Sequence, residues 1–514
     1  MKTSILQRHL HKGRAASRFI DRVRDSYTLK QLTRTQQARS YYDSFDWRLY
    51  RGGRVLERDG ADNGLCRIAP AAAGGPVLEG AMQGVPVFLQ DFPPGPLREA
   101  LTPLLGVRAL LKILTVQVDI RSYELRDARD KILLRLDREH YRIENNGPAL
   151  VNIRLYPLRG YEKAAQRVLK LLDQEDPLPE PRDGLLPILL QKCGRSALDY
   201  SSKLNLTLGP ELTMGQALVQ LLLYLLNILE RNIDGIVADT DTEFLHDFRI
   251  AGRRSRSLIT QVKNVFPGFH ELPYKQAFSR LSVKTCEHRD LDVFLQDMRQ
   301  HTELLPEPLR QDIEPLYSYL RQVRARQREA LLQWLDSREF RDFRQQWRAY
   351  LEHSVSEGQF EENGKLPVLA VADHFIWKIY RRLIKQGSAV QGAQDFDALH
   401  EVRKTAKKLR YLLESFRSLY PRDQIEEVIQ QLKRLQNLLG SIVDYHVQQA
   451  YLAGWSQSGA ASGLPAATDR AAESLIVSFR ALEDESCRKF RDRFTGFSSR
   501  ANTAMFRSLF RRGK

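Results

Sequence analysis

The feature that most constrains this chain is an internal duplication. Residues 246–267 read HDFRIAGRRSRSLITQVKNVFP and residues 400–421 read HEVRKTAKKLRYLLESFRSLYP, so the two segments align without a gap at an offset of 154 residues. The register extends further, because Asp290 and Asp444 each lie 44 residues after the histidine that begins their copy. A repeat of this kind predicts two structural half-units built on one plan.

Each copy is predicted to be a helix that carries a stripe of cations behind a histidine. Asp241 and Asp395 stand where the N-caps of these helices are expected. At about 100° per residue, positions 0, +3, +7 and +10 of a helix fall in one narrow sector. Those positions hold His246, Arg249, Arg253 and Arg256 in the first copy and His400, Arg403, Lys407 and Arg410 in the second. Like charges at this spacing repel, and a bound multivalent anion would relieve the repulsion.

Further cations are expected to enlarge this surface, mainly in the second half-unit. They are Arg254 and Lys408 within the copies, Lys378, Arg381, Arg382 and Lys385 in the helix before the second copy, and Lys433 and Arg434 after it. A solvated face is the ordinary explanation of one basic helix, but two copies with matching positions favour a shared anion site. Metal ligation would need more His, Cys or carboxylate side chains at ligand spacing, so no metal site is predicted.

The chain divides into a mixed first part and a helical second part. Short β-type runs, helices near 97–105 and 160–172, and partly alternating strands such as KILLRLDREHYRI predict an α+β domain with an antiparallel sheet or open barrel. From residue 211 a period of 3.6 residues dominates and predicts an all-α domain. The expected divisions are a basic segment at 1–24, the α+β domain at 25–180, a linker at 181–204, and the helical domain at 205–510, with half-units at about 211–360 and 365–510.

Composition narrows the class of partner. The 514 residues carry a net charge of +16 and 42% hydrophobic residues, which indicates a folded protein with an anionic partner. The four cysteines are far apart in sequence, so no CxxC metal or redox pair is expected. No signal-peptide pattern is visible, and the most apolar run, at 217–229, is shorter than a membrane span. The expectation is a cytoplasmic protein.

The duplicated residues closely resemble the CHAD family, the conserved-histidine α-helical domain. The family pattern, His followed by R-x-x-x-[RK]-[RK]-x-R, occurs twice as HDFRIAGRRSR and HEVRKTAKKLR. Its later signatures resemble RDLDVFL at 289–295 and LKRLQNLLGSIVD at 432–444. The resemblance covers residues 205–510 or so and implies two pseudo-symmetric four-helix units, a basic groove that binds inorganic polyphosphate, and association with polyphosphate granules.

The first part resembles a degenerate CYTH domain, the triphosphate-tunnel fold, over about residues 25–175. The resemblance lies in YYDSFDWRLYRGGRVLERDG at 41–60, LREALTPLLGVRALLKILTVQVDIRSYEL at 97–125, KILLRLD at 131–137 and PLRGYEKAAQRVL at 157–169. Catalytic members carry an N-terminal E-x-E-x-K that helps to hold metal and phosphate, and none precedes Tyr41. The candidates for an anion-binding tunnel are Arg121, Lys131, Arg135 and Lys163, with exposed cations on a sheet as the alternative.

Three functions follow from these observations. The leading hypothesis is a protein that binds inorganic polyphosphate without a cofactor, catalytic residue or turnover. The first alternative is a metal-dependent triphosphatase or polyphosphatase that uses the first domain, against which the missing acidic motif counts. The second alternative is nucleic-acid binding, which the charge permits but no HTH, RRM or OB signature supports.

Overall fold

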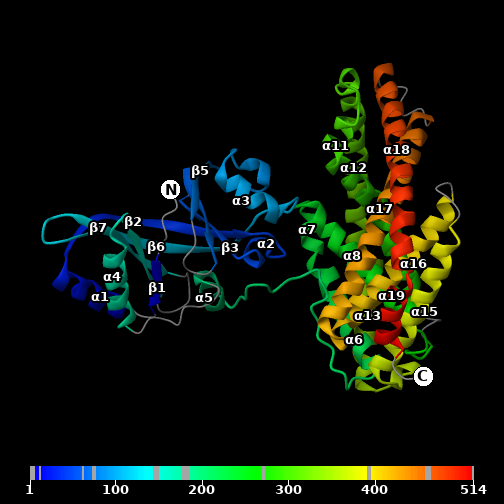
Figure 1. Cartoon of the computed structure of the whole chain (residues 1–514), viewed down its shortest axis with the longest axis horizontal. Helices are drawn as coiled ribbons and strands as arrows, with labels where there is room; N and C mark the ends of the chain where they lie inside the picture. The colour runs from blue at the N-terminus through cyan, green and yellow to red at the C-terminus, as the bar shows by residue number, and fades with distance from the viewer. Residues whose placement is uncertain are drawn as a thin grey trace. The chain divides into compact units, whose positions relative to one another are not determined.

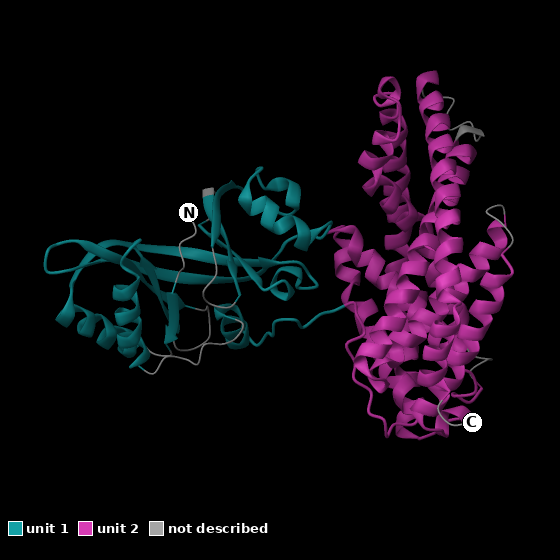
Figure 2. Ribbon diagram, in the orientation of Figure 1, with its two compact units in different colours: residues 1–201 teal, residues 202–514 magenta. Residues whose placement is uncertain are grey.

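The computed structural model describes residues 6–10, 13–60, 63–71, 77–142, 150–175, 184–268, 273–390, 395–457 and 465–511. The chain forms two compact units, residues 1–201 and 202–514 (Figure 2). The first unit is built around a β-sheet and the second is helical (Figure 1). The fold class predicted from the sequence, α+β followed by all-α, is confirmed.

Among the described residues of the first unit, eight strands form one antiparallel sheet in the order β1-β8-β7-β6-β2-β3-β4-β5. The strands are β1 Leu6–Leu10, β2 Thr28–Asp43, β3 Arg54–Asp59, β4 Asn63–Pro70, β5 Leu78–Gln83, β6 Leu111–Arg126, β7 Ile132–Arg142 and β8 Leu150–Pro157. The helices are α1 Gly13–Ser26, α2 Arg48–Arg51, α3 Pro96–Leu105, α4 Glu162–Asp173 and α5 Leu185–Lys192.

The first unit extends beyond both of its expected boundaries. The segment 1–24 was expected to lie outside the domain, but β1 pairs with β8 and α1 buries Phe19, Ile20 and Val23 in the sheet's core. The expected linker 181–204 contains α5, whose leucines pack in another core cluster of the same unit. Both segments carry an apolar face that must be buried, although short length and basic or proline-rich surroundings hide it. Three of the prolines that suggested a linker, at 177, 179 and 181, lie outside the described residues.

The longest strand at the N-terminal side, β2, was not predicted. Its 16 residues, TLKQLTRTQQARSYYD, are exposed along most of the first ten positions, so no apolar alternation marks them. The strand exists because it pairs on both sides, with β6 along nearly its whole length and with β3 at its end. Backbone hydrogen bonding to neighbours that are distant in sequence overrides the weak local signal.

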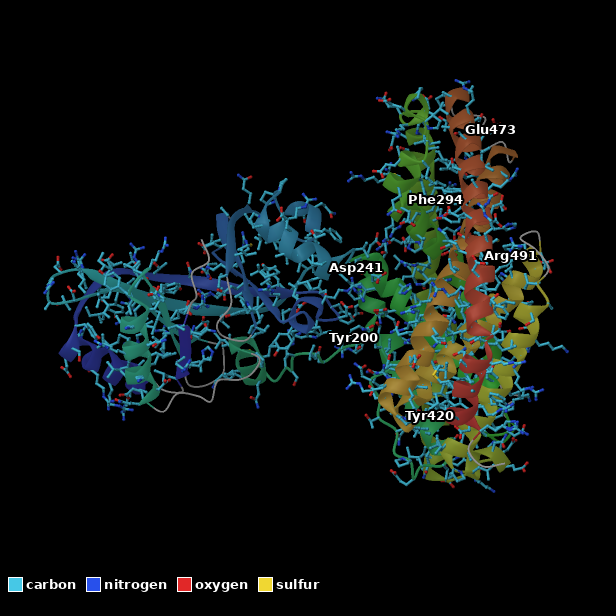
Figure 3. The ribbon with its side chains drawn as sticks, in the orientation of Figure 1. Tyr200, Asp241, Phe294, Tyr420, Glu473 and Arg491 are labelled. Carbon is cyan, nitrogen blue, oxygen red and sulfur yellow. The ribbon has the colours of Figure 1, made fainter. Side chains whose placement is uncertain are left out.

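The described regular elements of the second unit are helices, apart from one isolated β-bridge between Thr213 and Pro367. Its helices are α6 Met214–Arg231, α7 Ile233–Val237, α8 Thr242–Gln261, α9 Tyr274–Lys284, α10 Cys286–Gln296, α11 Met298–Glu303, α12 Glu314–Leu335, α13 Arg338–Ser356, α14 Glu362–Lys365, α15 Val368–Ser388, α16 Phe396–Phe416, α17 Arg422–Gln457, α18 Ala466–Phe497 and α19 Arg500–Phe510. Phe294, labelled in Figure 3, belongs to a core cluster in which α10 and α12 pack with α17 and α18.

The duplication is visible in where the helices begin. The starts of α6 and α15, and those of α8 and α16, differ by the same 154 residues as the sequence repeat. Between the half-units, the amide of Met214 donates to the carbonyl of Leu366 over 2.9 Å and the amide of Val368 donates to that of Leu212 over 3.0 Å. When each residue is replaced by its equivalent 154 positions away, the first hydrogen bond becomes the second. This is the relation that a pseudo-two-fold axis at the Thr213–Pro367 bridge requires.

The two half-units differ after the repeated segment. In the first, α9 ends and α10 begins on either side of the fully buried Thr285. In the second, the matching position is Leu439, and α17 runs through it without interruption. The hydroxyl of the threonine donates a hydrogen bond to a backbone carbonyl of the preceding turn, whereas the leucine packs in the core.

Candidate anion-binding site

The two motif helices begin as the sequence predicts. Asp241, labelled in Figure 3, accepts a hydrogen bond from the amide of Glu243 over 2.9 Å at the start of α8. Asp395 accepts from the amide of Ala398 over 3.2 Å at the start of α16. Each carboxylate satisfies an amide that the first helical turn leaves unpaired. The caps therefore fix the same register for both stripes.

The two stripes converge on one another. Burial lowers the pKa values of Arg403 and Lys407 on α16, and the charge of Arg253 on α8 lowers both further. The charge of Asp290, also from the first half-unit, acts on Arg403 in the opposite direction. Lys407 is half-buried, and this burial together with the charges of Arg403 and Arg253 lowers its pKa to about 7. Cations from both copies are therefore held close enough to repel, with Asp444 as the nearest opposing carboxylate of the second half-unit.

The equivalent arginines at the +3 position have different partners. Arg249 is 3% exposed and donates to the hydroxyl of Thr285 over 2.7 Å. Arg403 donates to Asp444 over 3.0 Å and remains partly exposed. Because Leu439 replaces Thr285 in the second half-unit, the side chain of Arg403 has no hydroxyl there and reaches the carboxylate instead. Arg249 thus lies in the interior, and Arg403 faces the convergent cations.

The next equivalent cations, Arg254 and Lys408, also differ in their partners. Arg254 is 9% exposed and donates to Glu414 over 2.8 Å, and Arg410 lies 3.7 Å from the same carboxylate. Under the 154-residue offset, Lys408 matches Arg254, Arg256 matches Arg410, and Thr260 matches Glu414.

The exchange of Glu414 for Thr260 leaves one group of cations without a carboxylate partner. The pKa of Lys408 is lowered by burial and then by the charge of Arg382 on α15, with Arg256 on α8 contributing in the same direction. The charge of Glu401 opposes this shift, but Glu401 forms its ion pair with Lys404, whose ammonium group donates a hydrogen bond to it over 2.7 Å. We call Arg253, Arg256, Arg382, Lys407 and Lys408 the open cations: none of them has an ion pair with any residue that the structure describes.

The motif histidines lie at the start of each stripe and are both half-buried. Burial, and then the charges of Lys404 and Arg403, lower the pKa of His400. His400 is therefore neutral at pH 7 and can offer a hydrogen bond rather than a charge. Its Nδ1 is buried and has no hydrogen-bond partner among the described residues.

The remaining predicted cations of the second half-unit fall on two surfaces. Lys378, Arg381 and Lys385 are exposed on α15 in the same sector as Arg382. Lys433 lies near the angular position of Asp444 on α17, whereas Arg434 lies about 80° away from Asp444 at 100° per residue. Arg434 lines a separate cavity between α17, α18 and α19.

The sheet unit holds a buried ionic network that the sequence did not reveal. Arg39, 1% exposed, donates to Asp59 over 2.6 Å and to Glu139 over 2.8 Å. Arg154 donates to Glu57 over 3.1 Å, and Arg67 contacts Glu57 and Asp59. Burial would raise the pKa of Glu57, but Arg154, Arg39 and Arg67 outweigh it and hold that pKa well below its usual value. The alternating charges in these strands resemble a solvent-exposed face, and only the packing of the folded unit shows that they are buried.

A cavity of about 800 Å³ lies beside this network, and it contains one of the four predicted tunnel residues. Arg135 lines the cavity together with Arg67 and Arg154. Lys131 is exposed at the start of β7, and Lys163 is exposed on α4.

Arg121 lies opposite Arg138 in the sheet register, and Arg138 reaches α1 on the other face. The interpretation of Lys131, Lys163 and Arg121 as tunnel residues is therefore not supported, because strand alternation and hairpin position turn them away. Arg67 and Arg154 are the cavity cations that the sequence reasoning missed.

Two searches of the described residues bear on other chemistries. Within the described ranges no three His, Cys, Asp or Glu side chains gather as a metal site requires. In the part of the chain that the structure covers, no helix is both long and apolar enough to cross a membrane.

Comparisons with known proteins find a family model that matches part of the helical unit. The CHAD domain model matches residues 220–453. The CHAD domain from the plant Ricinus communis aligns at 21% identity with a TM-score of 0.48, covering 56% of this chain and 94% of that one. A provisionally named adenylate cyclase from Bacillus halodurans aligns at 15% identity with a TM-score of 0.26, covering 35% of this chain and 94% of that one.

A protein from Hippeastrum, described as an adenylyl cyclase with a dominant triphosphatase activity, aligns at 11% identity with a TM-score of 0.27 and covers 39% of this chain and all of that one. A comparison with curated protein sequences finds no match.

Proposed function

Because its helical unit contains a CHAD domain, we propose that this chain binds inorganic polyphosphate without turning it over, across the open cations of α8, α15 and α16. The observation that carries the proposal is the meeting of two repeated stripes with fewer carboxylates than cations between them. A long polyanion that contacts both copies binds more tightly than one that contacts a single copy, because the second contact is effectively intramolecular.

Each residue type has a distinct part in this proposal. Arg253, Arg256 and Arg382 would donate charge-assisted hydrogen bonds to phosphate oxygens. Lys407 and Lys408 would bind as point charges whose mutual repulsion the polyanion relieves. Arg403 would exchange its bond to Asp444 for one to phosphate. The exposed cations of α15, with Lys433 of α17, would extend the surface along a longer chain.

The buried members of the repeat are left out of the proposed site. Arg249 is held by Thr285 and Arg254 by Glu414, so both act as links between helices. Arg410 lies 3.7 Å from the same Glu414 carboxylate, which it shares with Arg254. The first copy thus contributes Arg253 and Arg256, and the second copy contributes more.

The deciding experiment is a titration of long-chain polyphosphate against the variant Lys407→Ala with Lys408→Ala. At about 1 kcal/mol for each lost contact, affinity should fall roughly thirtyfold. The matched control is Arg299→Ala with Arg338→Ala, which removes two positive charges from side chains of the same unit that are 90% exposed. That control should change affinity less than threefold. Equal effects of the two variants would mean that only net charge matters, and the site would be rejected.

Parallel titrations with RNA and tripolyphosphate at two salt concentrations separate the alternatives. Nucleic-acid binding predicts that RNA competes at the same phosphate concentration as long polyphosphate. The triphosphatase alternative predicts phosphate release from tripolyphosphate with Mg²⁺ or Mn²⁺, and the arginine-paired carboxylates of the sheet unit argue against it. Localisation to polyphosphate granules is proposed on the same basis, and the double variant should lose it.

A further inference from the structure

Besides the cavity of the sheet unit, the helical unit has a cavity of its own. It lies on a different side of α17 from the side that faces the open cations. It has a volume of about 820 Å³ and is bounded by α17, α18 and α19. Its α17 residues, Glu427, Gln431, Arg434 and Leu438, follow one another at helical spacing. At about 100° per residue they centre some 110° from Asp444, which marks the side facing α16. The body of α17 therefore separates this cavity from the convergent stripes.

The cavity is lined both by cationic side chains without an ion pair and by apolar side chains. Arg434 and Arg493 are exposed and have no ion pair with any residue in the described ranges. Lys489 lies on the same face of α18 as Arg493 and pairs with Glu485 over 2.5 Å. The apolar lining consists of Leu438, Phe497 and Met505.

Two carboxylates also line the cavity. Glu427 and Asp492 do not form an ion pair with the arginines among the described residues. The lining residues are three cations and two carboxylates, and Glu485, which pairs with Lys489, lies outside the lining. The cations left without an ion pair are therefore the guanidinium groups of Arg434 and Arg493, which are suited to planar recognition of carboxylate or phosphate.

The first half-unit shows what such a position requires. Under the repeat offset, Arg434 matches Arg280, and Arg280 lies 2.7 Å from the carboxylate of Glu339. Glu339 is the second residue after the N-cap Ser337 of α13. In the second half-unit α19 packs on α15 as α13 packs on α6, so its N-cap Ser499 takes the place of Ser337, at an offset of 162 rather than 154 residues. The second residue after Ser499 is Ala501, which lines the cavity. The second half-unit therefore has the arginine but lacks the carboxylate.

We propose that the cavity between α17, α18 and α19 binds a small organic anion, with a carboxylate or phosphate head at Arg434 and Arg493 and an apolar body against Phe497 and Met505. The head takes the place that the Glu339 side chain fills in the first half-unit. The first turn of α19 favours a negative charge at the same point. This site is independent of polyphosphate binding at the open cations.

The test uses the full chain and three probes measured by calorimetry: 1-naphthyl phosphate, 1-naphthoate and the uncharged 1-naphthalenemethanol. We expect one of the two anions to bind with one-to-one stoichiometry and the alcohol to bind at least tenfold more weakly. The stronger anion identifies the head group. Equal binding of the alcohol would overturn the proposal, because the cations would then have no part.

Two variants place the binding in this cavity. Ala501→Glu inserts the missing carboxylate without removing any cation, and should weaken binding of the anionic probe at least tenfold. Arg434→Ala with Arg493→Ala should do the same. Ala501 is exposed in a first helical turn, where an acidic residue is favourable, so this variant should fold. Unchanged anion affinity in both variants would overturn the proposal.

Polyphosphate titration of the same variants separates this site from the proposed function. Arg434→Ala with Arg493→Ala should leave long-chain polyphosphate affinity within threefold of the original protein. Lys407→Ala with Lys408→Ala should leave naphthyl phosphate or naphthoate binding unchanged. A loss of polyphosphate binding through Arg434 and Arg493 as large as that through Lys407 and Lys408 would show one continuous surface, and the separate site would be rejected.

Discussion

At the scale of single residues, Lys407 is the most informative side chain of the proposed site. It is half-buried and surrounded by Arg403, Arg253 and Arg410, with Asp444 as the counter-charge. Its pKa of about 7 means that it is only partly charged near neutrality. A bound polyanion would raise that pKa again, so binding and proton uptake are linked.

The first prediction is a pH dependence of polyphosphate binding. The charged form of Lys407 binds, so affinity should be constant well below pH 7 and fall above it, by up to about tenfold per pH unit until the pKa of the complex is passed. Lys407→Arg keeps its charge and should bind equally at pH 6 and 8. Lys407→Met should bind weakly at both. Titration at constant ionic strength measures this, and an identical slope in the arginine variant would contradict it.

The second prediction concerns stability. Because the folded-state pKa of Lys407 lies below the unfolded value of 10.5, the unfolded chain binds more protons between about pH 7 and 10.5, and stability from this group rises with pH across that window. Lys407→Met removes the charge and should raise Tm more at pH 6 than at pH 10. One kcal/mol corresponds to roughly 2 °C for a unit as large as residues 202–514. Calorimetry at the two pH values tests it, and a lower Tm at pH 6 would contradict it.

At the scale of elements, the crossing of α8 and α16 decides which cations stay open. The same pair of helices is linked on one side by Arg254 and Glu414 and left unlinked on the other, between Lys408 and Thr260. A carboxylate at this position, as in Glu414, links the two helices but occupies a cation. A neutral residue, as in Thr260, leaves the cation available to a ligand. The repeat makes this visible, because each side is the control for the other.

The third prediction follows from this asymmetry. Thr260→Glu places a carboxylate at the position equivalent to Glu414, beside Lys408 and Arg256. Polyphosphate affinity should fall about tenfold, since a charge-assisted contact is worth roughly 1.5–3 kcal/mol before screening. Thr260→Gln has a similar size without the charge and is the matched control. If both variants bind polyphosphate equally well, Lys408 and Arg256 lie outside the site.

Elements also show where the repeat tolerates change. Gly252 in α8 matches Ala406 in α16, and a Cβ at Gly252 would lie 2.8 Å from Leu281 of α9. The glycine weakens the isolated helix by about 1 kcal/mol but permits close approach of α9. Sequence shows only the cost, and the packing shows the compensation.

At the scale of the whole molecule, the chain consists of two units with their own cores, residues 1–201 and 202–514. The core of the first contains Arg39 between Asp59 and Glu139, with Tyr141 as a further acceptor. The open cations lie entirely in the second. Damage to one core should therefore leave the function of the other intact.

The fourth prediction tests that independence. Arg39→Met removes one of two guanidinium partners from each of two buried carboxylates, leaving Asp59 with Arg67 and Glu139 with Arg154. The loss of this buried charge should destabilise the first unit by about 3 kcal/mol. Calorimetry should show one transition move to lower temperature while the other stays. Polyphosphate affinity should not change, and a tenfold loss would mean that the sheet unit contributes to binding. Arg34→Met, at a pair that is half exposed on the arginine side, is the control and should have little effect on either transition.

The sequence by itself determined the duplication, the starts of the motif helices and the order of fold classes. These follow from local rules: a capping aspartate, a 3.6-residue apolar period and an exact spacing of cations act within a few helical turns. The helical run at 217–229 became α6 for the same reason. Such signals need no knowledge of what lies across the core.

Only the tertiary structure decided which charges are available. Arg249 and Arg254 match Arg403 and Lys408 in sequence, yet they are buried by Thr285 and Glu414, residues distant along the chain. The polar strand β2 and the ionic network around Arg39 likewise depend on partners from other strands. The physical reason is that a charge's free energy depends on its burial and on its neighbours in space, and neither is written in local spacing.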